Sequence, residues 1–495
     1  MKYHAVLTTL FGASVIAGPA LADGGYYTGP LGPRAAGRGG AFVARADDLT
    51  AISINPAGLS EIEGTTFQVG NQFAHYGYDY TRAPTLDYGN EQNGMAPLVP
   101  FAKVSNGTPW QLALPFIGAA SRFGLRDWAF AAAIFAPPGI SREQFPEDGG
   151  QRYMMVDREA IILKTDVSAA WRFHHLFGFG VTVEWITVPR LDYSLMVNAA
   201  PFQGSAYPVA SPYDILAQTS GSDWLTFNAT VGGWVRPRPW LEFGVAGQVL
   251  PANIVTKSTL ALTPADPTGP LGGAGVTTSA NDVNITLPLP LTARAGARYR
   301  HLRGERELFD LELDAEYETW SRTQDFTLDT HGIVATAGGN LNQTIPLGTI
   351  QIAKHWSDVF SVKLGGDFNL VPDRWTVRAG AYYETAVAPA AYANVDFPGA
   401  EVLGAALGGS LLLQRLEIAL AYQLRYQPSF TVSEADARFY QQTPGNPCSE
   451  GGPPYSAAQG CNPNLVGQPG PVVNAGTYAS TSHLVSLALI YRYGR

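Results

Sequence analysis

The residues that most suggest chemistry in this chain are carboxylates at every second position from residue 310 to residue 318. Alternation at period two places such side chains on one face of an extended strand. Paired carboxylates on one face could act as the general acid and base of a glycosidase. Arginines shortly before them favour another interpretation, because a hairpin turning near Leu302 would set them opposite the carboxylates. The two sets are Arg294, Arg298 and Arg300, and Asp310, Glu312, Asp314, Glu316 and Glu318.

This hairpin should form a ladder of ion pairs. The expected partners, in a register whose residue numbers sum to about 610, are Arg300 with Asp310, Arg298 with Glu312, and Arg294 with Glu316. Five carboxylates on one strand face with arginines opposite them are typical of a scaffold inside a polar lumen. We therefore expect no catalytic role for them.

Other signals of an enzyme are missing from the sequence. It contains no GxSxG or HExxH motif, and no GK[ST] follows the glycines at residues 37–40. His174 and His175 fall in an expected short turn without an evident third metal ligand. We expect neither an enzyme nor a bound cofactor or metal ion.

The composition and the first residues indicate an exported protein. The 495 residues carry a formal net charge of -9, which argues against a nucleic-acid partner because such proteins present a basic face. Lys2 precedes a short apolar region, and Ala20-Leu21-Ala22 offers a cleavage site. We expect residues 1–22 to be a signal peptide; a retained N-terminal anchor is the alternative.

The two cysteines fit the same compartment. Cys448 and Cys461 enclose 12 residues of a Gly/Pro-rich stretch. An oxidising periplasm favours a disulfide between them over a metal site. We expect this disulfide to restrict a loop between the last two strands.

Beyond residue 64 the hydrophobic pattern is that of a transmembrane β-barrel. From Leu416 to Gln427, for example, large apolar residues alternate with polar or small ones, which suits a strand with one face toward lipid and one toward a lumen. Short and long connections alternate, as periplasmic turns and extracellular loops do in bacterial outer-membrane barrels. We predict an all-β fold, a fourteen-stranded antiparallel transmembrane barrel over residues 65–495. The expected strands span residues 65–82, 112–123, 128–140, 158–173, 178–197, 226–237, 241–263, 282–301, 305–330, 352–370, 375–386, 401–413, 415–436 and 477–493.

This architecture sets the expected location and surroundings. A closed barrel leaves no unpaired sheet edge in lipid, and an even strand count puts both chain ends in the periplasm. We expect a monomer in the bacterial outer membrane, in contact with outer-membrane lipid and lipopolysaccharide, or with detergent after extraction.

Residues 23–64 cannot be barrel wall, because they are rich in glycine and alanine and show no alternation. A wide lumen leaks unless it is filled, so we expect this segment to fold inside the barrel as a plug, or hatch. Asn55 as N-cap and Pro56 at the first helical position would begin a short helical turn there. A periplasmic tail with one capped turn is the alternative.

Three segments resemble the FadL/TodX-type outer-membrane transporters of hydrophobic compounds. They are GRGGAFVARADDLTAISINPAGLSEIEGTTFQVG, in which Asn55-Pro56-Ala57 matches the NPA signature of the family, TWSRTQDFTL in the ninth strand, and DRWTVRAGAYYETAVAP at the eleventh. The resemblance extends over nearly the whole mature chain. It implies a fourteen-stranded barrel closed by an N-terminal hatch, uptake of apolar molecules, and their lateral release into the outer membrane.

The third expected strand should be interrupted. Pro137 and Pro138 remove two consecutive backbone donors, and Gly139 allows a bend. We expect a side opening there, where the resemblance implies a kinked strand; the alternative is that the strand simply ends before the prolines. Pro288 and Pro290 raise the same question for the eighth strand, without support from the family.

A substrate with a carboxylate head group would need a cation in a largely apolar site. Arg190 is our first candidate, because its position has the parity opposite to Phe179 and Trp185 and should face the lumen. Lys164 is the second candidate. A rim or lumen charge without a ligand is the alternative for both.

Three classes of function remain open: a gated channel for hydrophobic compounds, a porin for polar solutes, and a surface barrel with an adhesive or structural role. An expected hatch of 42 residues favours the first class over the second, because an open porin has no use for it. We predict passive uptake of hydrophobic compounds such as long-chain fatty acids, with lateral release at the third strand. An aromatic-hydrocarbon channel of the same fold is the alternative.

Overall fold

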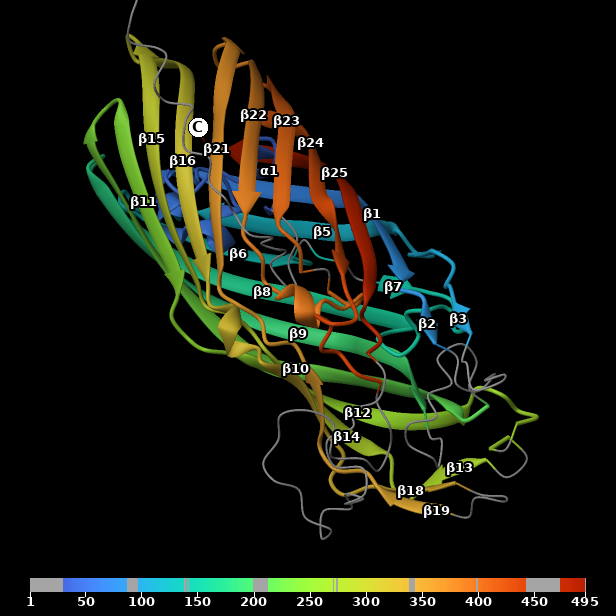
Figure 1. Cartoon of the computed structure of the whole chain (residues 1–495). Helices are drawn as coiled ribbons and strands as arrows, with labels where there is room; N and C mark the ends of the chain where they lie inside the picture. The colour runs from blue at the N-terminus through green and yellow to red at the C-terminus, as the bar shows by residue number, and fades with distance from the viewer. Residues whose placement is uncertain are drawn as a thin grey trace, which may run out of the picture.

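The structure, a computed structural model, describes residues 30–86, 97–137, 139, 142–198, 212–269, 271–272, 275–337, 343–397, 399–441 and 472–494. Over these ranges the chain forms a closed antiparallel barrel of fourteen wall strands (Figure 1). The first and last strands, β1 and β25, close it by pairing from Thr65 opposite Tyr493 to Arg82 opposite Gly476. The predicted fold is therefore confirmed. The expected signal peptide, Pro138 and both cysteines lie outside the described residues.

Several wall strands consist of two labelled segments. In wall order they are β1 (Thr65–Arg82), β4 and β5 (Val104–Ser105, Trp110–Ser121), β6 and β7 (Trp128–Phe135, Arg142–Gln144), β8 (Asp157–Phe173), β9 (Phe177–Asn198), β10 (Asp214–Arg238), β11 and β12 (Leu241–Gln248, Asn253–Pro264), β14 and β15 (Asp282–Pro288, Thr292–Arg303), β16 and β17 (Arg306–Glu318, Asp325–Asp329), β20 and β21 (Ile350–Ala353, Val359–Val371), β22 (Trp375–Glu384), β23 (Val402–Leu413), β24 (Leu416–Val432) and β25 (Gly476–Tyr493).

Smaller elements lie outside the wall ladder. Those beyond the ends of the wall strands are β2 (Thr85–Leu86), β3 (Leu98–Val99), β13 (Val276–Thr278), β18 (Val334–Ala337) and β19 (Gln343–Pro346), and the short helices between strands are η3 (Trp320–Arg322) and η4 (Ala390–Tyr392). Figure 1 places β13, β18 and β19 together at the end of the barrel that carries the long connections. We call this the long-loop end, and the opposite one the short-turn end.

The sixth strand departs most from the expected boundaries, because β10 begins at Asp214 and not at residue 226. Its pairing with β9 shifts register between Gly221 and Asp223 and again between Asp223 and Thr226. Each shift is a bulge, and the extra residues break the period-two pattern by which a strand is recognised. The alternation of apolar and polar residues therefore does not identify the first half of this strand.

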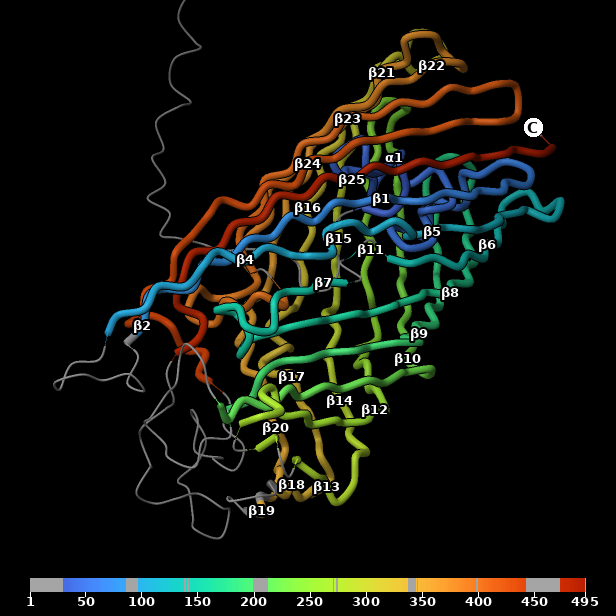
Figure 2. The backbone as a smooth tube through the Cα atoms, turned by 90° about the vertical axis from the view of Figure 1, so that its right-hand side faces the viewer, coloured from blue at the N-terminus to red at the C-terminus, as the bar shows by residue number. Residues whose placement is uncertain are grey.

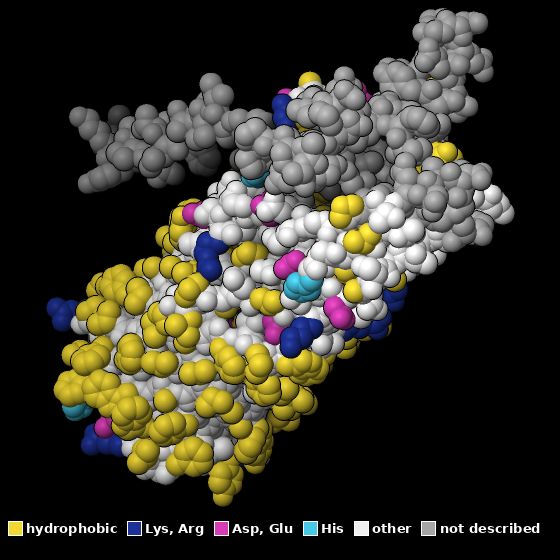
Figure 3. Space-filling view, turned by 90° about the horizontal axis from the view of Figure 1, so that it is seen from below, with side chains coloured by type: hydrophobic (Ala, Val, Ile, Leu, Met, Phe, Trp, Pro, Cys, Tyr) yellow, Lys and Arg dark blue, Asp and Glu magenta, His cyan; other side chains and the backbone are white. Residues whose placement is uncertain are grey.

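The alternation separates a lipid face from a lumen face. Leu420 is 53% exposed and its neighbour Ala421 only 1%. Figure 3 shows hydrophobic side chains in a broad band over one outer face of the wall. A continuous apolar exterior of this kind suits hydrocarbon. Among the described residues no helix has the length and apolar character to cross a membrane.

Residues 30–64, called the hatch below, lie inside the barrel. They form α1 (Pro33–Ala36), α2 (Ala51–Ile54) and the 3-10 helix η1 (Pro56–Glu61). The first helix contacts β23, β24 and β25, whereas η1 contacts β6, β8, β9 and β10 on the other side. A segment that touches walls far apart around the ring must cross the lumen, so these residues are not an external tail.

Candidate functional site

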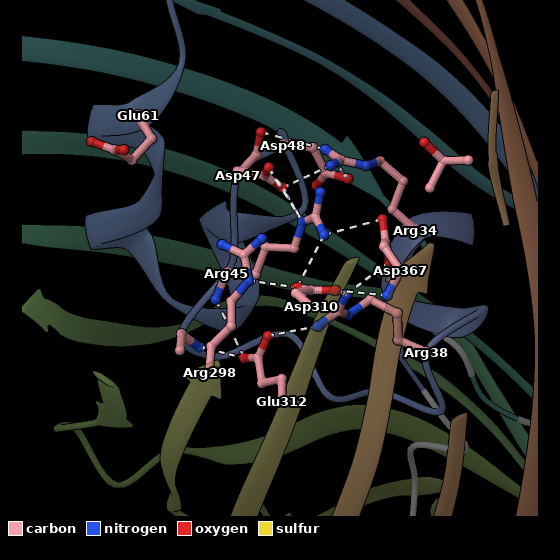
Figure 4. Close-up of polar contacts among 12 residues, drawn as sticks. Arg34, Arg38, Arg45, Asp47, Asp48, Glu61, Arg298, Asp310, Glu312 and Asp367 are labelled. Atoms are coloured by element: carbon pink, nitrogen blue, oxygen red, sulfur yellow. Dashed lines mark hydrogen bonds and ion pairs between the residues drawn. The ribbon is translucent and has the colours of Figure 1, made fainter. Parts of the chain in front are cut away.

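Buried ion pairs hold one side of the hatch (Figure 4). Arg38 is fully buried and donates to the carboxylates of Asp310, Glu312 and Asp367 at 2.8, 2.9 and 2.7 Å. Arg45 lies 3.1 Å from Asp310 and from Asp367. Short charge-assisted hydrogen bonds of this kind offset the cost of removing the charges from water. The hatch is therefore tied to β16 and β21.

The arginine–carboxylate hairpin has the expected register but mostly other partners. β15 and β16 set Arg294 opposite Glu316, Arg298 opposite Glu312, and Arg300 opposite Asp310. The observed contacts are Arg294 with Glu316 (2.9 Å), Arg298 with Asp310 (2.5 Å), Arg300 with Glu307 (2.7 Å), and Asp314 with the backbone N–H groups of Phe42 and Val43 (2.7 and 2.9 Å). The expected partners of Arg298 and Arg300 are therefore wrong, whereas Arg294 pairs with Glu316 as expected. The hatch fills the lumen at this level and binds carboxylates that do not pair with the arginines opposite them.

The Asn55-Pro56-Ala57 turn fits closely against the wall on the other side. Asn55 Oδ1 accepts a hydrogen bond from Ala57 N at 3.2 Å and caps η1, while its Nδ2 donates to one carbonyl of the hatch and one of the wall. The wall has glycine at this contact: a Cβ on Gly180 would lie 2.4 Å from Pro56 C, and one on Gly232 would lie 2.1 Å from Asn55 Oδ1. Only glycine allows this approach.

The third wall strand is interrupted. β6 ends at Phe135 and β7 begins at Arg142, and both segments pair with β8 (Figure 2). The interval contains Pro137 and Gly139, and the backbone link recorded for it is Ala136 N to Pro115 O at 3.0 Å. The loss of ladder bonds follows from the missing proline donors.

An apolar pocket lies level with this interruption, on the long-loop side of the hatch. A cavity of about 30 Å³ is lined by residues of four wall strands: Ala160 and Ile162 on β8, Val188 and Leu191 on β9, Ile254 on β12, and Leu287 on β14. Lys164 of β8 is opposite Phe135 and Glu159 is opposite Arg142, so the pocket residues of β8 fall between the ends of β6 and β7. The cavity has room for about one water molecule, and a larger ligand requires side chains to move.

Four aromatic rings extend the apolar cluster beside the pocket. Trp320 and Trp356 meet edge to face with centroids 5.3 Å apart, and Phe326 and Phe397 each pack against Trp356 at 5.5 and 5.8 Å. Perpendicular contacts of this kind add to the stabilisation from burial alone. The rings form a dense apolar wall next to the cavity.

Two buried cations adjoin the pocket. Arg158 lines the cavity, lies 2.8 Å from Glu143, and has its guanidinium carbon 4.1 Å from the ring centroid of Phe397. Its buried Nε has no hydrogen-bond partner among the residues that the structure describes. Lys354 is ion-paired with Asp396. A spare donor on a buried cation beside apolar side chains is what a ligand carboxylate or other oxygen could use.

A layer of charged side chains separates the pocket from the hatch. We call this set the charged layer: Lys164, Glu184, Arg294, Glu316, Lys363, Glu384 and Arg425. Lys164 lies 2.8 Å from Glu184, and Arg294 donates to the carbonyl of Ser53 in the hatch at 3.3 Å. An apolar molecule that crossed this layer would strip hydrogen bonds from charges. The layer is therefore a barrier between the pocket and the short-turn end.

The two expected head-group cations do not line the pocket. Lys164 faces the lumen but belongs to the charged layer. Arg190 is 52% exposed and lies 2.5 Å from Asp192, so its expected lumen-facing orientation is wrong. The β8–β9 ladder shifts register between Ile161 and Leu163, and this bulge turns Arg190 outward.

The two cations that do adjoin the pocket, Arg158 and Lys354, were not predicted from the sequence. Arg158 shares the parity of Lys164 on the same strand, so the pattern contained a signal for it. Lys354 and Asp396 lie outside regular strands, between β20 and β21 and before β23, where alternation carries no information. Among the described residues no group of His, Cys, Asp and Glu is arranged to hold a metal ion.

The family model described as outer membrane protein transport protein (OMPP1/FadL/TodX) matches residues 16–447. A crystal structure of a Pseudomonas aeruginosa FadL homologue is 17% identical and superposes with a TM-score of 0.69, covering 94% of this chain and 99% of the other. The P. putida toluene transporter TodX is 14% identical with a TM-score of 0.62, over 94% and 99% of the two chains. The Ralstonia pickettii toluene transporter TbuX is 14% identical with a TM-score of 0.58, over 94% and 98%. No curated protein matches in sequence.

Proposed function

Because this chain belongs to the outer membrane protein transport family (OMPP1/FadL/TodX), we propose that it is a passive channel for uptake of hydrophobic compounds across the bacterial outer membrane. One observation carries the proposal: an apolar pocket lies beside a break in the wall and above a charged layer. No catalytic arrangement is needed for this function, and we propose no enzymatic activity.

The path we propose leads sideways. A ligand enters among the connections at the long-loop end, moves into the pocket, and leaves through the interruption that contains Pro137 and Gly139, with Pro138 between them. The charged layer and the hatch oppose movement straight through the barrel. Burial of apolar surface supplies about 25 cal/mol per Å² at each step, so a gradient of affinity and consumption inside the cell set the direction.

We propose long-chain fatty acids as the substrate class. The pocket is lined by aliphatic side chains and one aromatic ring, Phe397, and has Arg158 at its edge and Lys354 nearby, which suits an alkyl chain that ends in a carboxylate. These two cations replace Arg190 and Lys164 as the proposed head-group contacts. An aromatic hydrocarbon is the second candidate, favoured by the four-ring cluster and by solved relatives that are named toluene transporters. An adhesive role for the long connections is the remaining alternative.

Binding by the purified barrel distinguishes the two substrate classes. We expect a long-chain acid to bind more tightly than the alcohol of equal length, and Arg158→Gln to weaken the acid about tenfold, the worth of one charge-assisted hydrogen bond. Glu143→Gln is the matched control, because it keeps the cation and should not weaken the acid. Equal binding of acid and alcohol, with tighter binding of toluene, would favour the aromatic class.

Uptake by cells tests the lateral route. Replacing Pro137, Pro138 and Gly139 with Val, Thr and Val should restore ladder donors and close the interruption. We expect this variant to fold and to bind the labelled acid while uptake is lost. Unimpaired uptake in a variant whose strand is shown to be continuous would exclude the route.

A further inference from the structure

A second discontinuity in the wall separates the sixth strand from the seventh. β10 pairs with β12 as far as Ser222 opposite Lys257, and with β11 from Thr230 opposite Gln248. Between these limits no described residues of the two strands pair, and the backbone link recorded is Val249 N to Ala229 O at 2.9 Å. We call residues 223–229 and 249–256 the seam.

Two side chains bridge the seam beside this backbone bond: Asp223, and Thr226, whose hydroxyl lies 3.0 Å from Asn253 O. The Asp223 carboxylate accepts hydrogen bonds from Leu225 N at 3.0 Å and Thr226 Oγ1 at 2.6 Å within its own strand, and from Val255 N at 2.9 Å across the seam. Asp223 is itself buried. A buried carboxylate with three donors binds them strongly, and it also positions the Thr226 hydroxyl that makes the second contact, so the loss of Asp223 weakens both contacts across the seam.

Apolar residues line the seam on both sides. Trp224 and Leu225 are 54% and 79% exposed on the outside, at the bulge of β10 between Asp223 and Thr226. On the inside, Ile254 belongs to the seventh strand and lines the apolar cavity. Val188, which also lines the cavity, is opposite Asp223. The cavity therefore adjoins the seam through Ile254 and Val188.

Proline explains why this part of the wall is weak. Pro251 lacks a backbone donor and lies in the gap between β11 and β12. The prolines of the eighth strand do not open it in the same way, because Leu289 N donates to Ala252 O and Leu291 N donates to Thr319 Oγ1, both at 2.9 Å. The seventh, eighth and ninth strands thus stay connected there, and the seam between the sixth and seventh is the weaker junction.

We propose that the seam is a second side exit for apolar ligands, with the Asp223 carboxylate as its latch. The inference rests on the proposed function, since it assumes that the cavity holds an apolar ligand. The two exits then flank one pocket, with strand three beside β8 and the seam beside β12. A ligand in the cavity reaches lipid at the seam without crossing the charged layer.

Photo-crosslinking of the full-length protein in lipid nanodiscs tests the exit. The probe is a long-chain fatty acid with a diazirine at the end of its alkyl chain, and labelled peptides are mapped by mass spectrometry. Labelling at Val188 or Ile254 reports the pocket, and labelling at Trp224 or Leu225 reports the outer lip. Leu420, which faces lipid on β24, measures labelling by probe dissolved in the bilayer. We expect lip labelling above this reference and competition by unlabelled acid at the concentrations that protect the pocket.

Variants of the latch sharpen the result. Asp223→Ala should raise lip labelling about fivefold, the change that the loss of one hydrogen bond makes to an open–closed equilibrium. Thr319→Val is the matched control, because it removes a bridging side chain at a junction that a backbone bond also holds. If Asp223→Ala fails to fold, Asp223→Asn replaces it, and wild-type labelling at the outer lip is compared with labelling at Leu420.

The outcomes separate this inference from the proposed function. Pocket labelling with lip labelling no higher than at Leu420 would overturn the second exit and leave the channel intact. Absence of pocket labelling would overturn the proposed function and the second exit together. Lip labelling that responds to Asp223→Ala but not to Thr319→Val would support the latch.

Discussion

The two sides of the hatch meet the barrel by different chemistry. On the side of β16 and β21, Arg38 and Arg45 lie among carboxylates of the wall at distances of 2.7 to 3.1 Å. On the side of the third strand, Ile52 and Leu59 of the hatch share an apolar cluster with Phe135. The first contact is directional and leaves buried charges if it is broken, whereas the second can repack around another apolar group.

This difference suggests which side of the lumen can accommodate a ligand. The apolar side adjoins the interruption between β6 and β7, and the ionic side lies across the lumen from it. An anchor on one side allows the other to yield without release of the whole hatch. The predictions below measure how strongly each side is held, as the free energy of local hatch opening from amide hydrogen exchange of residues 38–62.

The largest effect is expected from Arg38→Met. Removing this cation takes one buried partner from each of three carboxylates and should lower the free energy of hatch opening by about 3–5 kcal/mol. Leakage of small solutes should rise, while the barrel stays folded and should still migrate faster on gels unheated than boiled. Arg190→Met, on the exposed surface, is the matched control and should leave hatch exchange unchanged. Unchanged exchange in Arg38→Met would show that the ionic side is no anchor.

Ile52→Ala should weaken the apolar side by about 2–4 kcal/mol, because it leaves a cavity in a fully buried cluster. Unlike the arginine variant, it should be insensitive to salt, because no charge is lost. Ile117→Ala, at a lipid-exposed position of β5, is the control in hydrogen exchange. A loss as large and as sensitive to salt as that in Arg38→Met would contradict the proposed difference between the two sides.

Asn55→Ala should have a smaller effect, about 1 kcal/mol for one lost cap. The change should accelerate exchange in η1 more than at Arg38, because the turn contacts the wall near Gly180 and Gly232. Single-channel recording should show more frequent brief openings with an unchanged folded barrel. Uniform acceleration over the whole hatch would mean that its two sides open as one unit.

Acid below pH 3.8, the ordinary pKa of an aspartate, should produce the smallest effect and should act first on the ionic side. Burial by itself would raise the pKa of Asp47, but Arg34 and Arg45 together lower it below the usual carboxyl range. Because the folded pKa is depressed, this contribution is present above the ordinary carboxyl pKa and is lost as pH falls toward the folded value. Exchange near Arg45 should therefore accelerate in acid before exchange near Ile52, and the opposite order would contradict the assignment.

Part of the candidate site could be predicted from the sequence and part could not. Asn55 and Pro56 were recognisable because a cap and a first-turn proline are local signals. Arg190 was misplaced because parity counting assumes an unbroken ladder, and one bulge reverses every side chain beyond it. Lys354 could not be predicted, because it lies in an irregular connection and comes close to the pocket only when the barrel closes.

The sequence by itself determined the barrel, its fourteen strands, and the break at Pro137, because period-two alternation and missing proline donors are properties of neighbouring residues. Only the tertiary structure decided which charges meet. Arg38 lies far from Asp310 and Asp367 in the sequence but forms ion pairs with both. Carboxylates of β16 thus bind the hatch and not only the arginines opposite them on β15. The physical reason is that ion pairs in a lumen depend on what fills it, and side chains from distant segments compete there for the same partners.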